Sequence, residues 1–186
     1  MLMLEQRIQQ RFFDSADLKY QTAETLSRPL ADAVAALLGA ITGGGKVMVA
    51  GVGAAQPLGG LFVAFCVGRF ERERPPLPAL DCGGEPGADK RVQALGHPGD
   101  VLVLLDAGDG AAAAARAAVD AAHGQEMTVV LIAGQLPAAA IGALGETDVA
   151  IVVPHERVAR VLELQLLALH AMCDAIDLQL MGEQDP

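Results

Sequence analysis

Two carboxylates stand close together directly after an apolar run, at Asp106 and Asp109. Oxygen ligands at the end of a buried strand could bind a divalent cation. The alternative is that they cap the alanine-rich helix expected next and complement its dipole. Of these two interpretations, we favour capping. We therefore expect no metal.

A glycine-rich turn offers a second type of chemistry. Gly51-Val52-Gly53, followed by Gly59-Gly60, could cradle the phosphates of a dinucleotide. However, the spacing does not match Gly-x-Gly-x-x-Gly, and no acidic residue follows a second strand at the required distance. A strand-to-helix turn that needs positive φ explains these glycines better. We therefore expect no cofactor. The candidate ligand-pocket residues of the two loops are Gly51, Gly53, Ala55, Asp106, Asp109 and Gly110.

The remaining reactive side chains are sparse. The three cysteines (Cys66, Cys82 and Cys173) form no Cys-x-x-Cys pair, which favours reduced thiols in a cytoplasmic protein. The net charge of −10 argues against direct binding to nucleic acid or to anionic membranes. We find neither a signal peptide nor an uninterrupted apolar run that would span a membrane.

The elements that must position these groups follow from the apolar pattern. Short apolar runs at 46–50, 78–80, 100–105, 127–133 and 149–153 alternate with helical stretches. This alternation predicts a parallel five-stranded sheet covered on both faces, with function in the loops at the carboxyl ends of the strands. We predict one domain over residues 1–186: N-terminal helices over 1–44, an α/β core over 45–155 and a C-terminal helix over 156–182.

The N-terminal region is predicted to be a helical hairpin. The first helix would run from about Leu4 to Thr25, and Ser27 would cap a second helix with Pro29 in its first turn. The glycines at 43–45 would end that second helix. Helices that precede the first strand would form a layer outside the sheet, often an oligomer interface.

Several strings resemble the SIS (sugar isomerase) domain, and specifically phosphoheptose isomerases and their replication initiator-associating (DiaA-like) relatives. They are Gly-Lys-Val-Met-Val-Ala-Gly-Val-Gly (45–53), Gly-Arg-Phe-Glu-Arg-Glu-Arg-Pro-Pro-Leu-Pro-Ala (68–79), Val-Gln-Ala-Leu-Gly-His-Pro-Gly-Asp-Val-Leu (92–102), Met-Thr-Val-Val (127–130) and Val-Pro-His-Glu-Arg-Val-Ala-Arg-Val-Leu-Glu (153–163). The resemblance implies a flavodoxin-like three-layer αβα sandwich. It also implies a homotetramer with sites between subunits.

Carried over by position, the resemblance places five polar site residues of the isomerases on Leu58, Leu61, Phe65, Leu162 and His170. Four of these side chains are apolar here, and an apolar side chain can neither bind zinc nor act as a base. His170 would then be vestigial. These substitutions predict that the chain is not an enzyme.

Both loop regions also depart from the resemblance. The loop 51–55 and the loop 106–111 lack the hydroxyl side chains that cradle phosphate in the isomerases, and no Ser or Thr occurs between Asp100 and Met127. The segment 80–91 is shorter than its counterpart. Two carboxylates would also weaken the binding of an anion.

These observations lead to a prediction of a non-catalytic, oligomeric interaction module. Its most plausible partner is the replication initiator protein, contacted by the apolar pair Leu180-Met181 at the end of the last helix. Three alternatives stay open. The chain could be a phosphoheptose (sedoheptulose 7-phosphate) isomerase, a sugar-phosphate-binding sensor, or a diverged copy that co-assembles with an active relative.

Overall fold

The computed structural model describes residues 2–83, 87–135 and 140–182. Its helices are α1 (Leu2–Thr42), α2 (Gln56–Val67), α3 (Ala88–Leu95), α4 (Ala112–Gly124) and α5 (Val158–Met181), and its strands are β1 (Val47–Val52), β2 (Ala79–Asp81), β3 (Val101–Asp106), β4 (Thr128–Gly134) and β5 (Val149–Val153). Two short 3-10 turns are η1 (Gly53–Ala55) and η2 (Ile141–Ala143).

The five strands form one parallel sheet in the order β2-β1-β3-β4-β5. Every residue of β1 and of β3 is buried, as expected where helices cover both faces of a parallel sheet. The α/β sandwich predicted from the alternating apolar runs is therefore confirmed. Because all strands run the same way, the loops after β1, β2, β3 and β4 emerge at one edge of the sheet.

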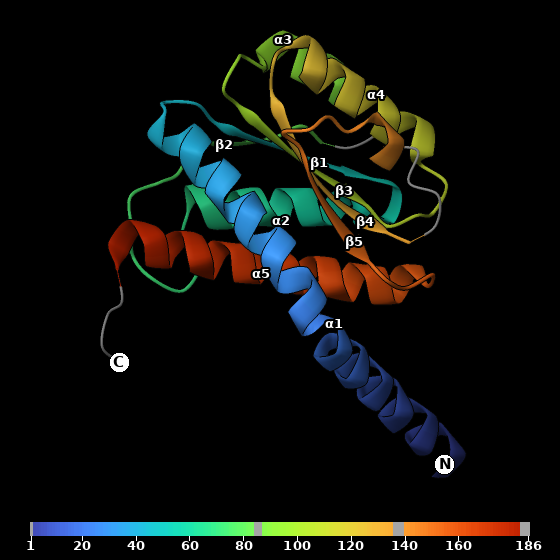
Figure 1. Ribbon diagram of the computed structural model, residues 1–186. Helices are drawn as coiled ribbons and strands as arrows, with labels where there is room; N and C mark the ends of the chain where they lie inside the picture. Colours follow the sequence, from blue (N-terminus) through green and yellow to red (C-terminus); the bar gives the residue numbers. More distant parts are fainter. Residues whose placement is uncertain (1, 84–86, 136–139, 183–186) are drawn as a thin grey trace.

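Two apolar cores lie on opposite faces of this sheet (Figure 1). On one face, α1, α2 and α5 pack over side chains such as Val49, Val103 and Ile132. On the other face, α3 and α4 cover Met48, Leu102 and their neighbours. The face of α4 that packs on the sheet is mostly alanine, so this helix lies close to the strands.

The predicted helical hairpin is wrong, because α1 is one continuous helix of 41 residues with Pro29 inside it. Ser27 does not cap a helix start; its hydroxyl donates to the carbonyl of Glu24 at 2.9 Å. A proline inside a helix costs about 3 kcal/mol. Burial of Leu26 before Pro29 and of Leu37 after it, against the same core, offsets that cost.

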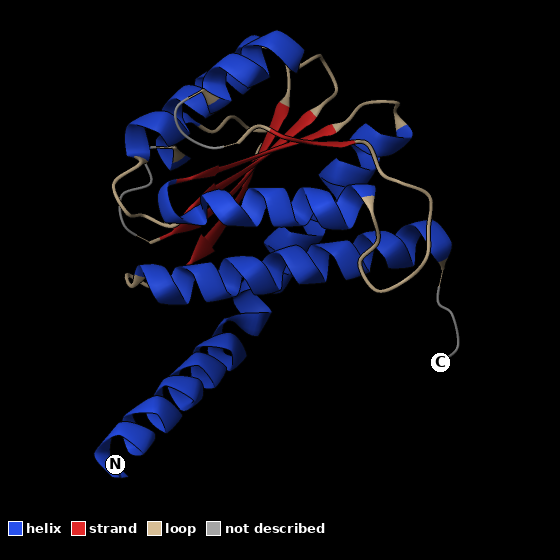
Figure 2. Cartoon of the chain, turned by 180° about the vertical axis from the view of Figure 1, so that it is seen from behind, coloured by secondary structure: helices blue, strands red, loops and turns tan. Residues whose placement is uncertain are grey.

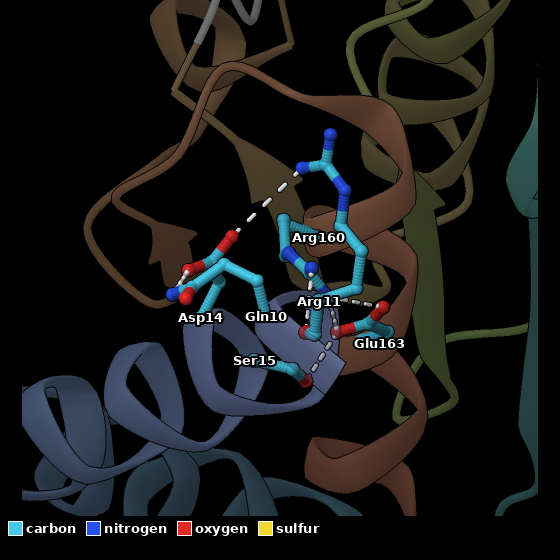
Figure 3. Close-up of polar contacts among 6 residues, drawn as sticks. All are labelled: Gln10, Arg11, Asp14, Ser15, Arg160 and Glu163. Carbon is cyan, nitrogen blue, oxygen red and sulfur yellow. Dashed lines mark hydrogen bonds and ion pairs between the residues drawn. The ribbon is translucent and has the colours of Figure 1, made fainter. Parts of the chain in front are cut away.

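The N-terminal half of α1 projects away from the sheet and its covering helices (Figures 1 and 2). Polar contacts with α5 mark the point where it leaves the body (Figure 3). Ser15 Oγ donates to Glu163 Oε2 at 2.5 Å, and Arg160 Nη2 donates to the carbonyl of Arg11 at 2.9 Å. On the N-terminal side of these contacts the helix exposes Leu2, Met3, Leu4 and Ile8, and Phe12 is exposed between the two contacting residues.

Within the described ranges 2–83, 87–135 and 140–182, no helix combines the length and apolar character needed to cross a bilayer.

Candidate functional site

The loops after β1 and β3 meet at the carboxyl edge of the sheet through Asp109. Its Oδ2 accepts a hydrogen bond from the backbone N–H of Ala54 at 2.7 Å. Gly53 adopts φ +54°, and a Cβ at this position would overlap the Asp109 carboxylate. Gly53 therefore has two reasons to be glycine, its backbone angle and the approach of Asp109.

Asp106 ends β3 and is buried, with Oδ1 accepting from the N–H of Gly108 at 2.8 Å. The prediction that Asp106 and Asp109 cap the next helix is wrong. Helix α4 begins at Ala112, and in the part of the chain that the structure describes no side chain caps it. The reason is the loop path, because Gly108 and Gly110 both adopt positive φ and carry the chain away before α4 starts.

A third carboxylate at this edge, Asp81, was missed by the sequence analysis. It ends β2, and its Oδ1 accepts from the N–H of Gly83 at 2.7 Å. Its other oxygen lies beside α2, because a Cβ at Gly60 would be 3.2 Å from Oδ2. Gln56, the first residue of α2, donates from Nε2 to the carbonyl of Gly83 at 3.3 Å. The sequence could have indicated Asp81, because a carboxylate directly after a short apolar strand lies at the edge where parallel sheets bind ligands.

Leu58, Leu61 and Phe65 lie on α2, and none of the three is fully buried. Leu61 is 37% exposed, whereas Leu58 and Phe65 are partly buried against the core. The ring of Phe65 meets the imidazole of His170 edge-on, with centroids 5.5 Å apart. Phe70 lies 5.4 Å from the same imidazole. The structure thus brings together Phe65 and His170, two of the five positions named from the resemblance.

The partly buried Leu162 lies on α5 and packs against the same core. Gln165, one turn further along, was missed by the sequence analysis. It is fully buried, and its Nε2 donates to the carbonyls of Asp106 at 3.1 Å and of Ile132 at 2.8 Å. It therefore joins the last residue of β3 to a residue within β4. Among the described residues its Oε1 has no hydrogen-bond partner.

Comparisons with known proteins are consistent with this geometry. The family model for the SIS domain matches residues 11–134. Over 98% of both chains, the sequence is 52% identical to a protein of Methylibium petroleiphilum named phosphoheptose isomerase. The chain belongs to the phosphoheptose isomerase family of SIS-domain proteins. A second family member, from Aromatoleum aromaticum, is 37% identical over 96% of this chain and 97% of its own.

Solved structures of the phosphoheptose isomerase family share the fold. The phosphoheptose isomerase of Neisseria gonorrhoeae superposes with a TM-score of 0.84 at 31% identity, over 94% of this chain and 98% of that one. The enzyme from Francisella tularensis gives the same TM-score and identity, over 95% and 99% of the two chains. The relationship therefore includes the strands and loops that form the candidate site.

These relatives overturn the prediction of a non-catalytic module. The 52% identical relative carries the name of the enzyme, so the prediction that the chain is not an enzyme is wrong. That prediction weighed five side chains, whereas the relationship to the phosphoheptose isomerase family extends over nearly the whole chain. The comparisons give no support to the replication initiator as partner. Leu180 and Met181 are 38% and 40% exposed at the end of α5, and a binding role for them stays a prediction.

The residues present do not fit the zinc that the resemblance implied. Zinc in proteins takes three or four nitrogen, oxygen or sulfur ligands. Of the positions carried over, only His170 offers one, since the others are Leu58, Leu61, Phe65 and Leu162. In the ranges that the structure describes, no three His, Cys, Asp or Glu side chains gather as a metal site. We therefore derive no reaction step through a metal.

Proposed function

We propose that the chain is an aldose–ketose isomerase that acts on a seven-carbon sugar phosphate such as sedoheptulose 7-phosphate. The observation that carries this proposal is the 52% identity, over 98% of both chains, with a protein named phosphoheptose isomerase. The fold shared with solved phosphoheptose isomerases supports it, and so does the parallel sheet, because ligands of such sheets bind at the carboxyl edge of the strands.

The reaction moves a proton between two neighbouring carbons of the open-chain sugar, so it needs a group that accepts and returns a proton. We infer that Asp81 and His170 are the candidates for this transfer. Asp81 is exposed beside the first turns of α2, and His170 is partly exposed behind Phe65. A carboxylate and an imidazole are both common proton-transfer groups near neutral pH.

The phosphate end of the substrate would be received by backbone N–H groups of the two glycine-rich loops. Of the six pocket residues named from the sequence, the candidates are the four without a carboxylate, namely Gly51, Gly53, Ala55 and Gly110. The start of α2 lies behind the first loop and favours a negative charge there. Asp109 now accepts from the amide of Ala54 in that loop, so the substrate phosphate would compete with this carboxylate.

We further infer that the active form is a homo-oligomer. The large apolar side chains on the projecting half of α1 support this, since Met3 is 83% and Phe12 is 73% exposed in the single chain. A groove between α1 and α5, lined by apolar residues such as Leu26, Leu30 and Leu167, offers a surface for the same helix of another copy.

Solvent deuterium exchange tests the isomerase proposal. The purified full-length protein is incubated with sedoheptulose 7-phosphate in D2O, with and without added zinc, and the sugar is followed by proton NMR. We expect an aldose phosphate to form, with deuterium entering C1 of the ketose and C2 of the aldose. His170→Asn and Asp81→Asn should each lower the rate at least tenfold if their side chains move the proton.

A matched control is Asp120→Asn, which removes one exposed carboxylate of α4 that pairs with Arg116. It should leave the exchange rate unchanged. Absence of exchange and of product at stoichiometric protein would overturn the proposal. Binding of the sugar phosphate without exchange would also overturn it, and would favour the sensor.

A further inference from the structure

Two of the three cysteines belong to one buried cluster between α2 and α5. Cys66 lies in the last turn of α2 and Cys173 lies on α5, and both are 2% exposed within the same core. The third, Cys82, belongs to the core on the other face of the sheet. The fold therefore separates one pair of thiols from the remaining one.

Arg74 fixes the geometry of this cluster. Its Nη1 donates to the carbonyl of Cys66 at 2.8 Å and its Nη2 to the carbonyl of Phe65 at 2.7 Å. Its Nε donates to Asp177 Oδ1 at 2.5 Å. Asp177 lies four residues after Cys173, so the two share one face of α5. A single buried guanidinium thus ties the end of α2 to the part of α5 that carries Cys173.

The two thiols lie in the same core, on helices that Arg74 joins, and a hydrogen bond between them makes their pKa values unequal. The hydrogen bond from the Cys173 thiol lowers the pKa of Cys66; burial opposes this effect, and the charge of Arg74 adds to it. The same hydrogen bond, together with burial, raises the pKa of Cys173. One sulfur is therefore the better nucleophile, and the other stands beside it as a proton donor.

We propose that Cys66 and Cys173 form a reversible disulfide that links α2 to α5 when the protein meets a small peroxide. The Cys66 thiol ionises and its sulfur attacks one peroxide oxygen, the O–O bond breaks, and the leaving hydroxide takes up the proton that the thiol lost, so that a sulfenic acid and one water result. The Cys173 sulfur then attacks the Cys66 sulfur, its proton leaves with the departing oxygen, and a second water forms. Two thiols and one hydrogen peroxide give one disulfide and two waters.

A disulfide between Cys66 and Cys173 would affect the candidate site, because both cysteines are close in sequence to residues of that site. Cys66 directly follows Phe65, and Cys173 lies three residues beyond His170 on α5. A covalent link between the sulfurs would fix the spacing of the two helices where Phe65 meets His170. Access for a small oxidant requires only local opening, because Cys66 lies one residue before the end of α2 at Val67.

Cys82 provides an internal control. Burial raises the pKa of its thiol to about 11, so little thiolate is present near neutral pH. It also lies in the other core, away from the cluster. A disulfide that forms in the folded protein should therefore leave Cys82 free, whereas one that forms after unfolding should include it at random.

The experiment treats the reduced full-length protein with a small excess of hydrogen peroxide under native conditions. Remaining thiols are then alkylated in denaturant, and intact mass and peptide mapping follow. We expect a loss of two hydrogens and a Cys66–Cys173 peptide at least tenfold more abundant than any peptide linked through Cys82. Dithiothreitol should restore three alkylatable thiols. The Cys82→Ala variant should behave like the parent, whereas Cys66→Ala and Cys173→Ala should not lose the two hydrogens.

The peptide map of the parent protein decides the question even if an alanine variant does not fold. Three free thiols after treatment, or comparable yields of links through Cys82, would overturn the proposal. So would a Cys66–Cys173 link that forms only in denaturant. The disulfide should also shift the unfolding midpoint to higher urea, because a cross-link restricts the unfolded chain. None of these readouts depends on isomerase activity.

Discussion

The Asp109 carboxylate accepts a hydrogen bond from the backbone N–H of Ala54 at 2.7 Å, across the gap between the loops after β1 and β3. An acidic side chain of one loop thus accepts the hydrogen bond of a backbone amide in the other loop. That donor precedes α2, where the helix dipole favours an anion. A substrate phosphate and Asp109 therefore compete for the same edge of the sheet.

This competition predicts that removing the charge of Asp109 strengthens the binding of anions. Asp109→Asn should lower the Kd for sedoheptulose 7-phosphate about tenfold, a gain of about 1.4 kcal/mol, because a like charge next to the phosphate is lost. Isothermal titration calorimetry at low ionic strength measures the change. Asp120→Asn alters the net charge equally on exposed α4 and should leave the Kd unchanged.

A Kd that is unchanged or higher in Asp109→Asn would contradict the competition. It would mean that the carboxylate shapes the loop and does not occupy a phosphate position. The unfolding free energy of the same variant, measured in urea, separates a disturbed loop from a missing repulsion.

The buried pair of Arg74 and Asp177 predicts a large loss of stability when one partner is removed. Both side chains are 2% exposed, and Arg74 also binds two carbonyls at the end of α2. Arg74→Met leaves Asp177 buried without its cation, which should cost about 3–5 kcal/mol of unfolding free energy. Urea denaturation followed by circular dichroism measures it.

The matched control is Arg116→Met, which breaks an exposed pair with Asp120 on α4. Exposed pairs contribute about 0–1 kcal/mol, so this variant should unfold almost like the parent. If the two variants lose the same free energy, the buried pair does not hold α2 to α5.

The fold was predictable because each strand carries its own signal. The uninterrupted apolar runs that become β1 and β3 are buried on both faces, and no local alternative competes with them. The continuous α1 was not predictable, because Ser27 and Pro29 together are typical of a helix start. A single continuous helix is favoured by tertiary packing, because Leu26 and Leu37 are buried in the same core.

The site was predictable in its location but not in its contacts. The loops of Asp106 and Asp109 lie where a parallel sheet places its ligands. The neighbouring sequence, however, does not predict the hydrogen bond between Asp109 and Ala54, because this contact depends on the register of β1 with β3. Gln165 was missed for the same reason, because its two carbonyl partners, Asp106 and Ile132, belong to different strands.

Asp100 predicts a pH dependence of stability at the opposite edge of the sheet. Burial raises the pKa of this carboxyl, but hydrogen bonds from Lys46 Nζ, the Lys46 amide and the His97 amide outweigh it, so the pKa lies below its usual 3.8. A lowered folded pKa stabilises the protein above the unfolded pKa. That stability is lost as the pH falls through the folded pKa.

We therefore expect Asp100→Asn to be clearly less stable than the parent at pH 7, with the difference shrinking below about pH 4. Urea unfolding of both proteins at several pH values measures the difference. Asp120→Asn, whose pair with Arg116 is exposed, should show a difference near zero throughout. A difference for Asp100→Asn that stays constant down to pH 2 would show that shape, and not charge, is what Asp100 supplies.

The projecting half of α1 predicts self-association through its apolar face. Phe12 is 73% exposed between Arg11 and Ser15, the two residues that contact α5, and large exposed apolar side chains of this kind mark an interaction surface. Phe12→Asp places a charge in that contact and should lower the molecular mass measured by size-exclusion chromatography with light scattering. Leu95→Asp changes an apolar side chain that is 43% exposed at the end of α3, and should leave the mass unchanged. A parent protein that is monomeric at micromolar concentration would contradict the homo-oligomer, whereas equal loss of mass in both variants would place the contact elsewhere than on α1.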